Sequence, residues 1–230
     1  MEFVIITTIL QAVLYTIAFG YSWAVIYGNF WKRFSIQKKA YRDDVFSRRL
    51  PLILINMSLV LILSFSGFYF TQDFYIMWEF PPIWLMLVQI ATVILVDDFY
   101  FYFYHRTLHE NKYLLKTIHK RHHTASKPFP MDYMYVHPLE WMLGTIGVVL
   151  GVSTVFLIFG EMHAWTFWTY ICIRNFHEMH IHSGVKSTLV RHLSLIGTSD
   201  HHDLHHSKPV GNYSSTLKIW DKILGTEVKK

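Results

Sequence analysis

The sequence predicts an all-α integral membrane protein with four to five transmembrane helices and a cytosolic helical cap that holds a histidine-rich dimetal site. Three observations lead to this prediction. Apolar residues make up 52% of the 230 residues and charged residues only 16%, against roughly 25% in a typical soluble domain. Long uncharged runs recur along the chain, and histidine, with 15 copies, is unusually frequent.

The composition also excludes several classes of protein. An aromatic content of 17% with a high apolar fraction excludes a disordered chain. The single cysteine, Cys172, excludes an intramolecular disulfide framework and a cysteine-ligated zinc module. The N-terminus lacks a basic segment and carries Glu2, so it does not read as a cleavable signal.

Four uncharged runs are each near the roughly 20 residues that a helix needs to cross a bilayer. They are 3–27, 50–70, 83–96 with its aromatic continuation 99–104, and 143–159. A shorter fifth run, 164–173, either crosses as well or folds back with its predecessor as a half-depth hairpin. The alternative of buried helices in a soluble protein fails, because a globule of this size has too little polar surface to cover four such runs.

The basic residues predict the orientation. All 21 Lys and Arg lie in three stretches, seven in 31–49, six in 105–137 and eight in 174–230, whereas 71–80 has none. Because cytosolic loops are enriched in Lys and Arg, these three stretches are expected in the cytosol. The N-terminus and 71–80 then lie outside, and 160–163 is a tight outward turn. The net charge of +5 therefore indicates topology and not nucleic-acid binding.

Fourteen of the fifteen histidines lie in the last two basic stretches, in groups with ligand spacing. Side chains four apart share a helix face, so an HxxxH pair can chelate one metal. In HxxHH, the middle histidine is turned by about 100° from the last one, so the triad can reach two metals. The HxxxH pair is His105 and His109, and the triads are His119, His122, His123 and His202, His205, His206.

A looser cluster holds His177, His180 and His182. A lone histidine is usually a packing or surface residue, and we assign that role to His163, His192 and His201. Imidazole suits zinc, copper, iron and nickel. A hydrolytic zinc site needs only three protein ligands, and no HExxH motif occurs, so eight or more clustered histidines favour two metals with nearly all-nitrogen coordination.

Several motifs together resemble the fatty acid hydroxylase and sterol desaturase superfamily, whose members are membrane di-iron enzymes. Asp98, Tyr102 and His105 fit its D-x-x-x-Y-x-x-H-R-x-x-H run, and the other matches are HPxE at 137–140, HSG at 182–184 and a closing NYG…WDRLFGT at 212–226. Ser214 and Leu224 depart from the closing pattern, where Gly and Phe are common. The resemblance covers roughly 95–226, which divides the chain into N-terminal membrane helices with a basic cytosolic loop, 1–94, and a catalytic region, 95–230.

The resemblance implies a set of metal ligands and a set of residues around them. The implied ligands are His105, His109, His119, His122, His123, His182, His202, His205 and His206, with His177 or His180 as a tenth. Asp98, Glu140, His137 and Tyr102 are expected around them, since a ligating imidazole usually donates its other N–H to a neighbouring group. Open alternatives are a helix-end charge for Asp98, an interfacial aromatic for Tyr102, and an amphipathic interfacial segment for Trp220–Asp221.

The implied function is a di-iron oxygenase that hydroxylates or desaturates a sterol, fatty acyl or related lipid, in a bacterial inner membrane or the endoplasmic reticulum. The implied cofactors are two iron ions, with no bound organic cofactor. Electrons would come from a cytochrome or ferredoxin, which we expect to dock on a basic surface formed by Lys112, Lys116, Lys120, Arg121 and Lys127. The alternative is that these residues only set the topology or contact anionic lipid headgroups. The alternatives are a histidine-rich metal transporter and a non-catalytic metal-binding membrane protein. The sequence predicts no oligomeric state.

Overall fold

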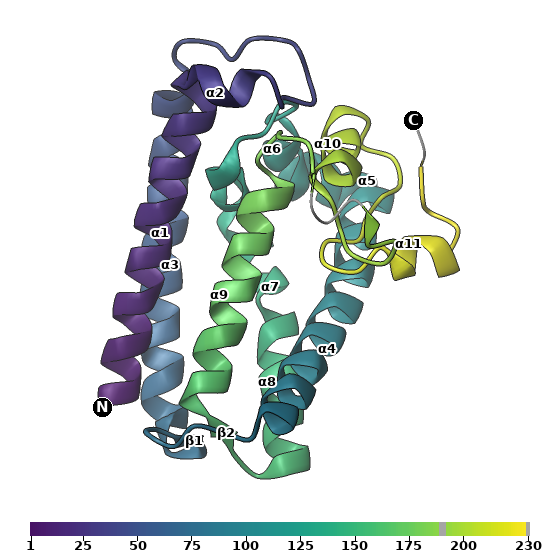
Figure 1. The fold of residues 1–230 in the computed structure, drawn as a ribbon. Helices are drawn as coiled ribbons and strands as arrows, with labels where there is room; N and C mark the ends of the chain where they lie inside the picture. The colour runs from purple at the N-terminus through teal and green to yellow at the C-terminus, as the bar shows by residue number, and fades with distance from the viewer. Residues whose placement is uncertain (189–191, 229–230) are drawn as a thin grey trace.

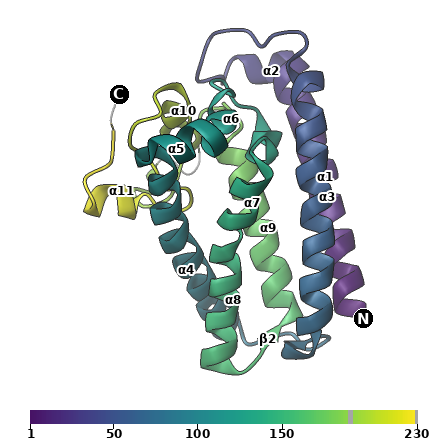
Figure 2. The same cartoon turned by 180° about the vertical axis from the view of Figure 1, so that it is seen from behind.

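The computed structural model describes residues 1–188 and 192–228, and nearly all of its regular structure is helical (Figure 1). Arg191, Lys229 and Lys230, which contribute to the third basic stretch, lie outside the described residues. The axes of the long helices lie roughly along the length of the molecule, as Figure 2 also shows from behind. They are α1 (Glu2–Tyr27), α3 (Val45–Thr71), α4 (Ile83–Glu110), α8 (Ile146–Phe159) and α9 (Ala164–Ile181). The predicted all-α class is confirmed.

Among the described residues, four helical segments are long and apolar enough to cross a membrane, namely Glu2–Tyr27, Val45–Phe74, Ile83–Glu110 and Pro138–Phe159. The last of these joins α7 (Pro138–Gly144) to α8. Large apolar side chains point away from the bundle, and Leu157 is 87% exposed. Exposed apolar surface of this extent marks contact with lipid. The protein is therefore an integral membrane protein.

Two glycines bring α4 and α8 close together. A Cβ atom on Gly147 would lie 2.4 Å from Asp97 Oδ1, and one on Gly151 would lie 2.8 Å from the Val93 carbonyl oxygen. Small residues four apart let helix backbones approach closely in a membrane. This pair therefore holds α8 against the helix that carries the first histidines.

The fifth apolar run forms the first half of α9. After Gly160, whose φ is +79°, the chain passes through β2 (Met162–His163), which pairs in parallel with β1 (Tyr75–Ile76). From there α9 returns beside α1 to the end of the molecule that holds the short helices (Figure 1). Its 18 residues correspond to about 27 Å of helix. The run is thus part of a long return helix and not of a half-depth hairpin.

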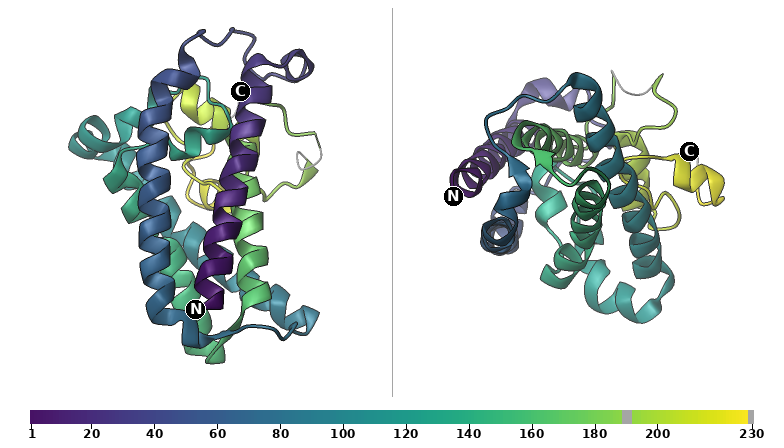
Figure 3. Two further views of the ribbon diagram at one scale, coloured as in Figure 1. Left: turned by 90° about the vertical axis from the view of Figure 1, so that its left-hand side faces the viewer. Right: turned by 90° about the horizontal axis from the view of Figure 1, so that it is seen from below.

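The two ends of the bundle differ. The N-terminus, η1 (Gln72–Phe74), β1 and β2 lie at one end, and short helices form a cap at the other (Figures 1 and 3). The cap and the adjoining loops contain α2 (Asn29–Lys32), α5 (Lys112–Leu114), the π-helical turn η2 (Leu115–His119), α6 (Lys120–His123), η3 (Pro130–Met134), α10 (Ser199–Ser207) and α11 (Ile219–Ile223). The loops that are rich in Lys and Arg and those that lack them thus lie at opposite ends of the bundle, as the distribution of basic residues predicts. Which end faces the cytosol stays a prediction.

The N-terminal helices fasten the loop that follows α6. The buried Asn56 side chain donates to the carbonyl oxygens of Met134 and Val136, both at 2.9 Å. Ser22 Oγ accepts from the Met131 N–H at 3.0 Å, and Arg49 forms an ion pair with the buried Asp132. The predicted regions 1–94 and 95–230 therefore pack against each other. The division of the chain between residues 94 and 95 stays a prediction.

Candidate metal centre

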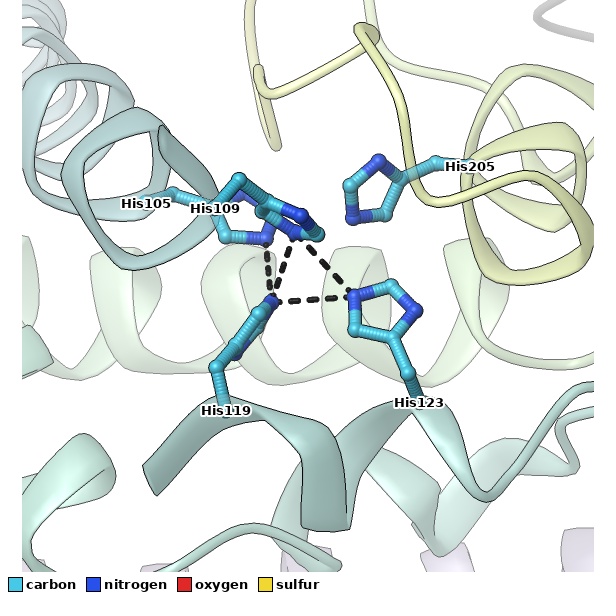
Figure 4. Close-up of side chains that lie close together, drawn as sticks. All are labelled: His105, His109, His119, His123 and His205. Atoms are coloured by element: carbon cyan, nitrogen blue, oxygen red, sulfur yellow. Dashed lines mark hydrogen bonds between the residues drawn. The ribbon is translucent and has the colours of Figure 1, made fainter. Parts of the chain in front are cut away.

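In the part of the chain that the structure describes, nine buried or half-buried imidazoles gather at the capped end as two groups. Within each group, one ring nitrogen from every histidine lies within 4.8 Å of the others. The first group is His105, His109, His119, His123 and His205, shown in Figure 4, and the second is His122, His182, His202 and His206. These are the nine histidines that the resemblance implies. Their role as ligands stays a prediction.

Helix geometry explains how the histidines divide between the groups. In the first HxxHH triad, His119 and His123 point to the first group and His122 to the second. The second triad is reversed, because His202 and His206 point to the second group and His205 to the first. Side chains four apart share a face and the residue between them points elsewhere. Each triad therefore contributes to both groups.

Hydrogen bonds at Nδ1 set the tautomers of the first group. The Nδ1–H of His105 donates to the Tyr213 carbonyl oxygen at 2.7 Å, and that of His205 donates to the Gly211 carbonyl oxygen at 2.8 Å. The Nδ1–H of His119 donates to Glu140 Oε1 at 2.8 Å. A neutral imidazole that donates from Nδ1 presents a lone pair at Nε2. These three rings therefore direct Nε2 lone pairs into the group.

The Nε2 atoms of the first group lie against one another. His119 Nε2 is 3.2 Å from His105 Nε2, 2.8 Å from His109 Nε2 and 2.9 Å from His123 Nε2 (Figure 4). Lone pairs that converge in this way repel one another unless a cation lies between them. Neutral imidazole nitrogens are good ligands for divalent transition metals. The first group therefore fits a metal ion.

The second group also brings together ring nitrogens of four histidines. His182 Nδ1–H donates to the Glu178 carbonyl oxygen at 3.0 Å, and its Nε2 is 3.0 Å from His202 Nε2. His206 Nε2 is 3.2 Å from His202 Nε2, and the His206 ring centroid is 4.5 Å from that of His122. This group also fits a metal ion, with one protein nitrogen fewer than the first.

Burial keeps the clustered imidazoles neutral. It lowers the pKa of His122, His202 and His206 well below the usual histidine range, and neighbouring imidazoles lower it further. Burial also lowers the pKa of His123 to about 3. Metal binding needs the unprotonated imidazole. At neutral pH these side chains are therefore in the form that metal binding requires.

Neither candidate for the tenth ligand joins a group. His177 Nε2 lies 3.3 Å from the Ser215 carbonyl oxygen, and His180 Nε2 lies 2.7 Å from Ser187 Oγ. The three histidines given structural roles also lie outside both groups. His163 pairs with the Glu79 carbonyl oxygen at the opposite end of the bundle, and His201 lies beside Asp221.

The four residues expected around the ligands differ in how they lie relative to the histidine groups. Glu140 accepts a hydrogen bond from His119, and its role beside a ligand stays a prediction. His137 instead caps α7, because its Nδ1 accepts from the Leu139 N–H at 3.2 Å. Tyr102 pairs with the Thr226 hydroxyl at 2.9 Å and does not point into the histidine groups.

Asp98 supports the site from a greater distance than expected. Its carboxylate accepts from the N–H groups of Thr216 and Leu217 and from Trp220 Nε1, at 2.8, 3.1 and 2.7 Å. It lies seven residues before His105, about 10 Å along the helix, so it cannot reach the ligand rings. It holds the C-terminal loop, and the same loop supplies the Tyr213 carbonyl that orients His105.

Asp221 is a structural residue whose role the sequence left open. It is fully buried and accepts from the N–H groups of Tyr213 and Ser214 and from the Thr226 hydroxyl. Together with the Trp220 bond to Asp98, these contacts identify the closing Trp-Asp motif as the support of the loop beside the metal centre.

Two charged side chains near the candidate centre, Glu178 and Arg174, were not predicted from the sequence. Glu178 accepts from Ser215 Oγ at 2.9 Å, and Arg174 pairs with Asp97 at 3.1 Å. Both line a cavity of about 80 Å³ that also reaches His122 and His202. The signal for Glu178 was its position four residues before His182 on the same helix face. Arg174 gave a weaker signal, as a charge at the end of an apolar run.

Comparison with known proteins agrees with this geometry. The fatty acid hydroxylase family model matches residues 90–226, more than half of the chain. The chain belongs to this family. The match begins in α4 before the first histidines and ends after the closing loop, so it includes both histidine groups. No solved structure matches the chain.

Three similar proteins are named as methylsterol monooxygenases or oxidases. The chain is 41% identical over 150 residues to methylsterol monooxygenase erg25B of Aspergillus fumigatus, covering 64% of this chain and 50% of that protein. It is 34% identical over 213 residues to methylsterol monooxygenase 1 of Rattus norvegicus, covering 87% and 69%. A C-4 methylsterol oxidase of Candida albicans is 39% identical over 151 residues, covering 64% and 48%. The chain thus spans about half to two thirds of these relatives.

Proposed function

We propose that this protein is a membrane-bound di-iron monooxygenase that hydroxylates an alkyl group of a sterol. The observation that supports this most strongly is the pair of converging imidazole groups beside a cavity that also has apolar walls. Family membership and the names of the relatives favour iron and a methylsterol. They also favour hydroxylation over desaturation.

In this proposal each residue has a defined role. Two iron ions held by the nine histidines would supply the O2-activating chemistry that side chains lack. Glu140 and the carbonyl groups of Tyr213, Gly211 and Glu178 orient the ligand rings, as partners of ligating imidazoles do. Aromatic walls such as Phe101 and Trp141 exclude water and receive the hydrocarbon. One oxygen atom of O2 enters a C–H bond, and the other leaves as water after taking up two electrons and two protons.

The electrons come from a separate donor of the cytochrome or ferredoxin type. Four residues of the predicted docking surface, Lys112, Lys116, Lys120 and Arg121, are exposed on α5, η2 and α6. Lys127 is half-buried and donates a hydrogen bond to the Lys39 carbonyl oxygen, so it contributes less to the exposed basic surface. The exposed four flank His119 and His122 in the sequence, which supports electron delivery close to both groups. Opposite charge on the donor would speed encounter.

The cap lies on the cytosolic side of the membrane in this proposal, and the relatives favour the endoplasmic reticulum. Their names do not favour the alternatives, a metal transporter or a non-catalytic metal-binding protein.

The test uses the full chain in lipid nanodiscs, with metal analysis and ¹⁸O2 incorporation. We expect two irons per chain and an ¹⁸O-labelled 4-methylsterol product only when NADPH, a reductase and cytochrome b5 or ferredoxin are all present. His192→Ala, on an exposed side chain outside the groups, should behave like the wild type. Product without a donor protein would refute the need for a partner. Full iron content with no product from any sterol would refute the proposed function.

A further inference from the structure

A large apolar cavity lies between α3, α7 and α8. Its volume is about 420 Å³, within the range of small-molecule sites. Its walls include Gly67, Phe68, Val149 and Phe156, which lie on candidate membrane spans. Val149, on the wall, is 58% exposed, so the cavity reaches the surface of the bundle. At this depth the surrounding medium is the bilayer.

A second cavity, of about 110 Å³, shares walls with the first and reaches α1 and α9. The two cavities share Ser64, Phe68, Thr145 and Phe167 among their walls. The second cavity also touches Arg174, which lines the cavity at the histidine groups as well. The three spaces therefore adjoin one another between the outside of the bundle and the candidate metal centre.

Trp141 and Thr145 line all three cavities. They are one turn apart at the junction of α7 and α8, where the Thr145 hydroxyl donates to the Trp141 carbonyl oxygen at 2.9 Å. The innermost cavity then ends on His105, His122 and His202. A molecule that moves along this series must pass these two side chains.

We propose that the hydrocarbon part of a membrane sterol enters sideways from the bilayer between α3 and α8 and passes Trp141 and Thr145 to reach the histidines. This inference rests on the proposed function, because it assumes that the centre acts on a lipid. The walls of the outermost cavity are mainly apolar, which favours a hydrocarbon over a water-soluble substrate. Trp141 and Thr145 act as positioning residues that limit the width of what reaches the centre.

Two glycines provide a matched test. A Cβ atom on Gly67 or on Gly20 meets no atom within 4 Å, and both glycines lie on exposed faces of candidate spans. Gly67 lines the outermost cavity, whereas Gly20 lines none of the three. Gly67→Phe therefore narrows the path at little packing cost, and Gly20→Phe adds the same side chain elsewhere. Ser64→Phe, between the outer and middle cavities, is a second blocking variant.

The probe is a diazirine-bearing sterol in nanodiscs, with the crosslinked residues identified by mass spectrometry. We expect wild type and Gly20→Phe to be labelled along the path, including Trp141. Gly67→Phe and Ser64→Phe should lose labelling at Trp141 several-fold and show a similar fall in kcat/KM, with metal content unchanged. Unchanged labelling at Trp141 in both blocking variants would overturn the proposal, and so would an equal loss in Gly20→Phe.

Photolabelling needs no turnover, so the two proposals can fail separately. Labelling that depends on Gly67, in a protein that oxidises no sterol, would refute the proposed function and keep the path. Normal turnover in both blocking variants, together with unchanged labelling, would refute the path and keep the function.

Discussion

His122 and His123 are neighbours in the chain, yet their imidazoles belong to different histidine groups. Their ring centroids are 5.6 Å apart and their planes are inclined by 79°. His123 faces the first group with His109, whereas His122 faces the second group with His182. One short helix therefore joins the two halves of the candidate metal centre.

This relationship predicts different losses from neighbouring substitutions. His122→Ala should remove the metal of the second group, because only three imidazoles would remain there. His123→Ala leaves four imidazoles in the first group and should weaken that metal less. Activity should be abolished by His122→Ala and reduced by His123→Ala. Metal content per chain by mass spectrometry checks this, and equal losses from both variants would contradict it.

The same measurement tests the middle histidine cluster. We expect His182→Ala to lower metal content, because His182 lies in the second group. His177→Ala and His180→Ala should keep it, since their side chains bond to Ser215 and Ser187. Loss of metal in His177→Ala with full metal in His182→Ala would contradict this order.

Glu140→Gln should weaken metal binding without unfolding the protein. The amide can still accept from His119 Nδ1, but it lacks the negative charge that makes the ring a better ligand. Loss of such a partner costs about 10–100-fold in metal affinity. Competition with a chelator measures the change. Glu110→Gln, on an exposed residue paired with Arg106, is the control, and an equal effect there would show that only surface charge matters.

Asp98→Asn should destabilise the C-terminal loop. The carboxylate accepts three hydrogen bonds, and the amide group of asparagine would turn a donor toward at least one of the three donors. Loss of a hydrogen bond to a charged group costs about 1.5–3 kcal/mol. Thermal unfolding should therefore shift downward, and limited proteolysis should cut sooner near Thr216. Asp73→Asn, on an exposed side chain, is the control, and an equal shift there would argue against this role.

The metal-free protein should lose stability in acid. Burial lowers the pKa of His122, His202 and His206 in the folded state, so the unfolded chain takes up protons first as the pH falls below about 6.5. Each such histidine removes about 1.4 kcal/mol of stability per pH unit below that value. Unfolding of chelator-treated protein between pH 8 and 5 measures this loss. A rise in stability on acidification would contradict the assignment of neutral imidazoles.

The predicted topology can be tested with single cysteines. After Cys172→Ser, Ala40→Cys should react with an impermeant maleimide only from the cytosolic side, and Asp73→Cys only from the opposite side. Both positions are exposed, and the basic residues place them on opposite sides of the membrane. Labelling of both from the same side would refute the topology.

Local patterns in the sequence were sufficient for the spans and for the histidine spacing. Uncharged runs of adequate length identify membrane helices because hydrocarbon excludes charge. The spacing in His119–His123 indicates that one helical segment can face two metals, because side chains three and four positions along differ by about 100° around a helix. These inferences need no knowledge of distant contacts.

Only the tertiary structure decided which distant segments meet. Asp98 and His105 share a stripe of α4, but the loop at 212–226 determines that the first binds backbone and the second receives the Tyr213 carbonyl. The return of α9 brings His182 to His202 of α10, and α3, α7 and α8 together line the outermost cavity. Such contacts depend on helix packing and on chain reversal between segments 20 to 118 residues apart, which spacing along one helix does not encode.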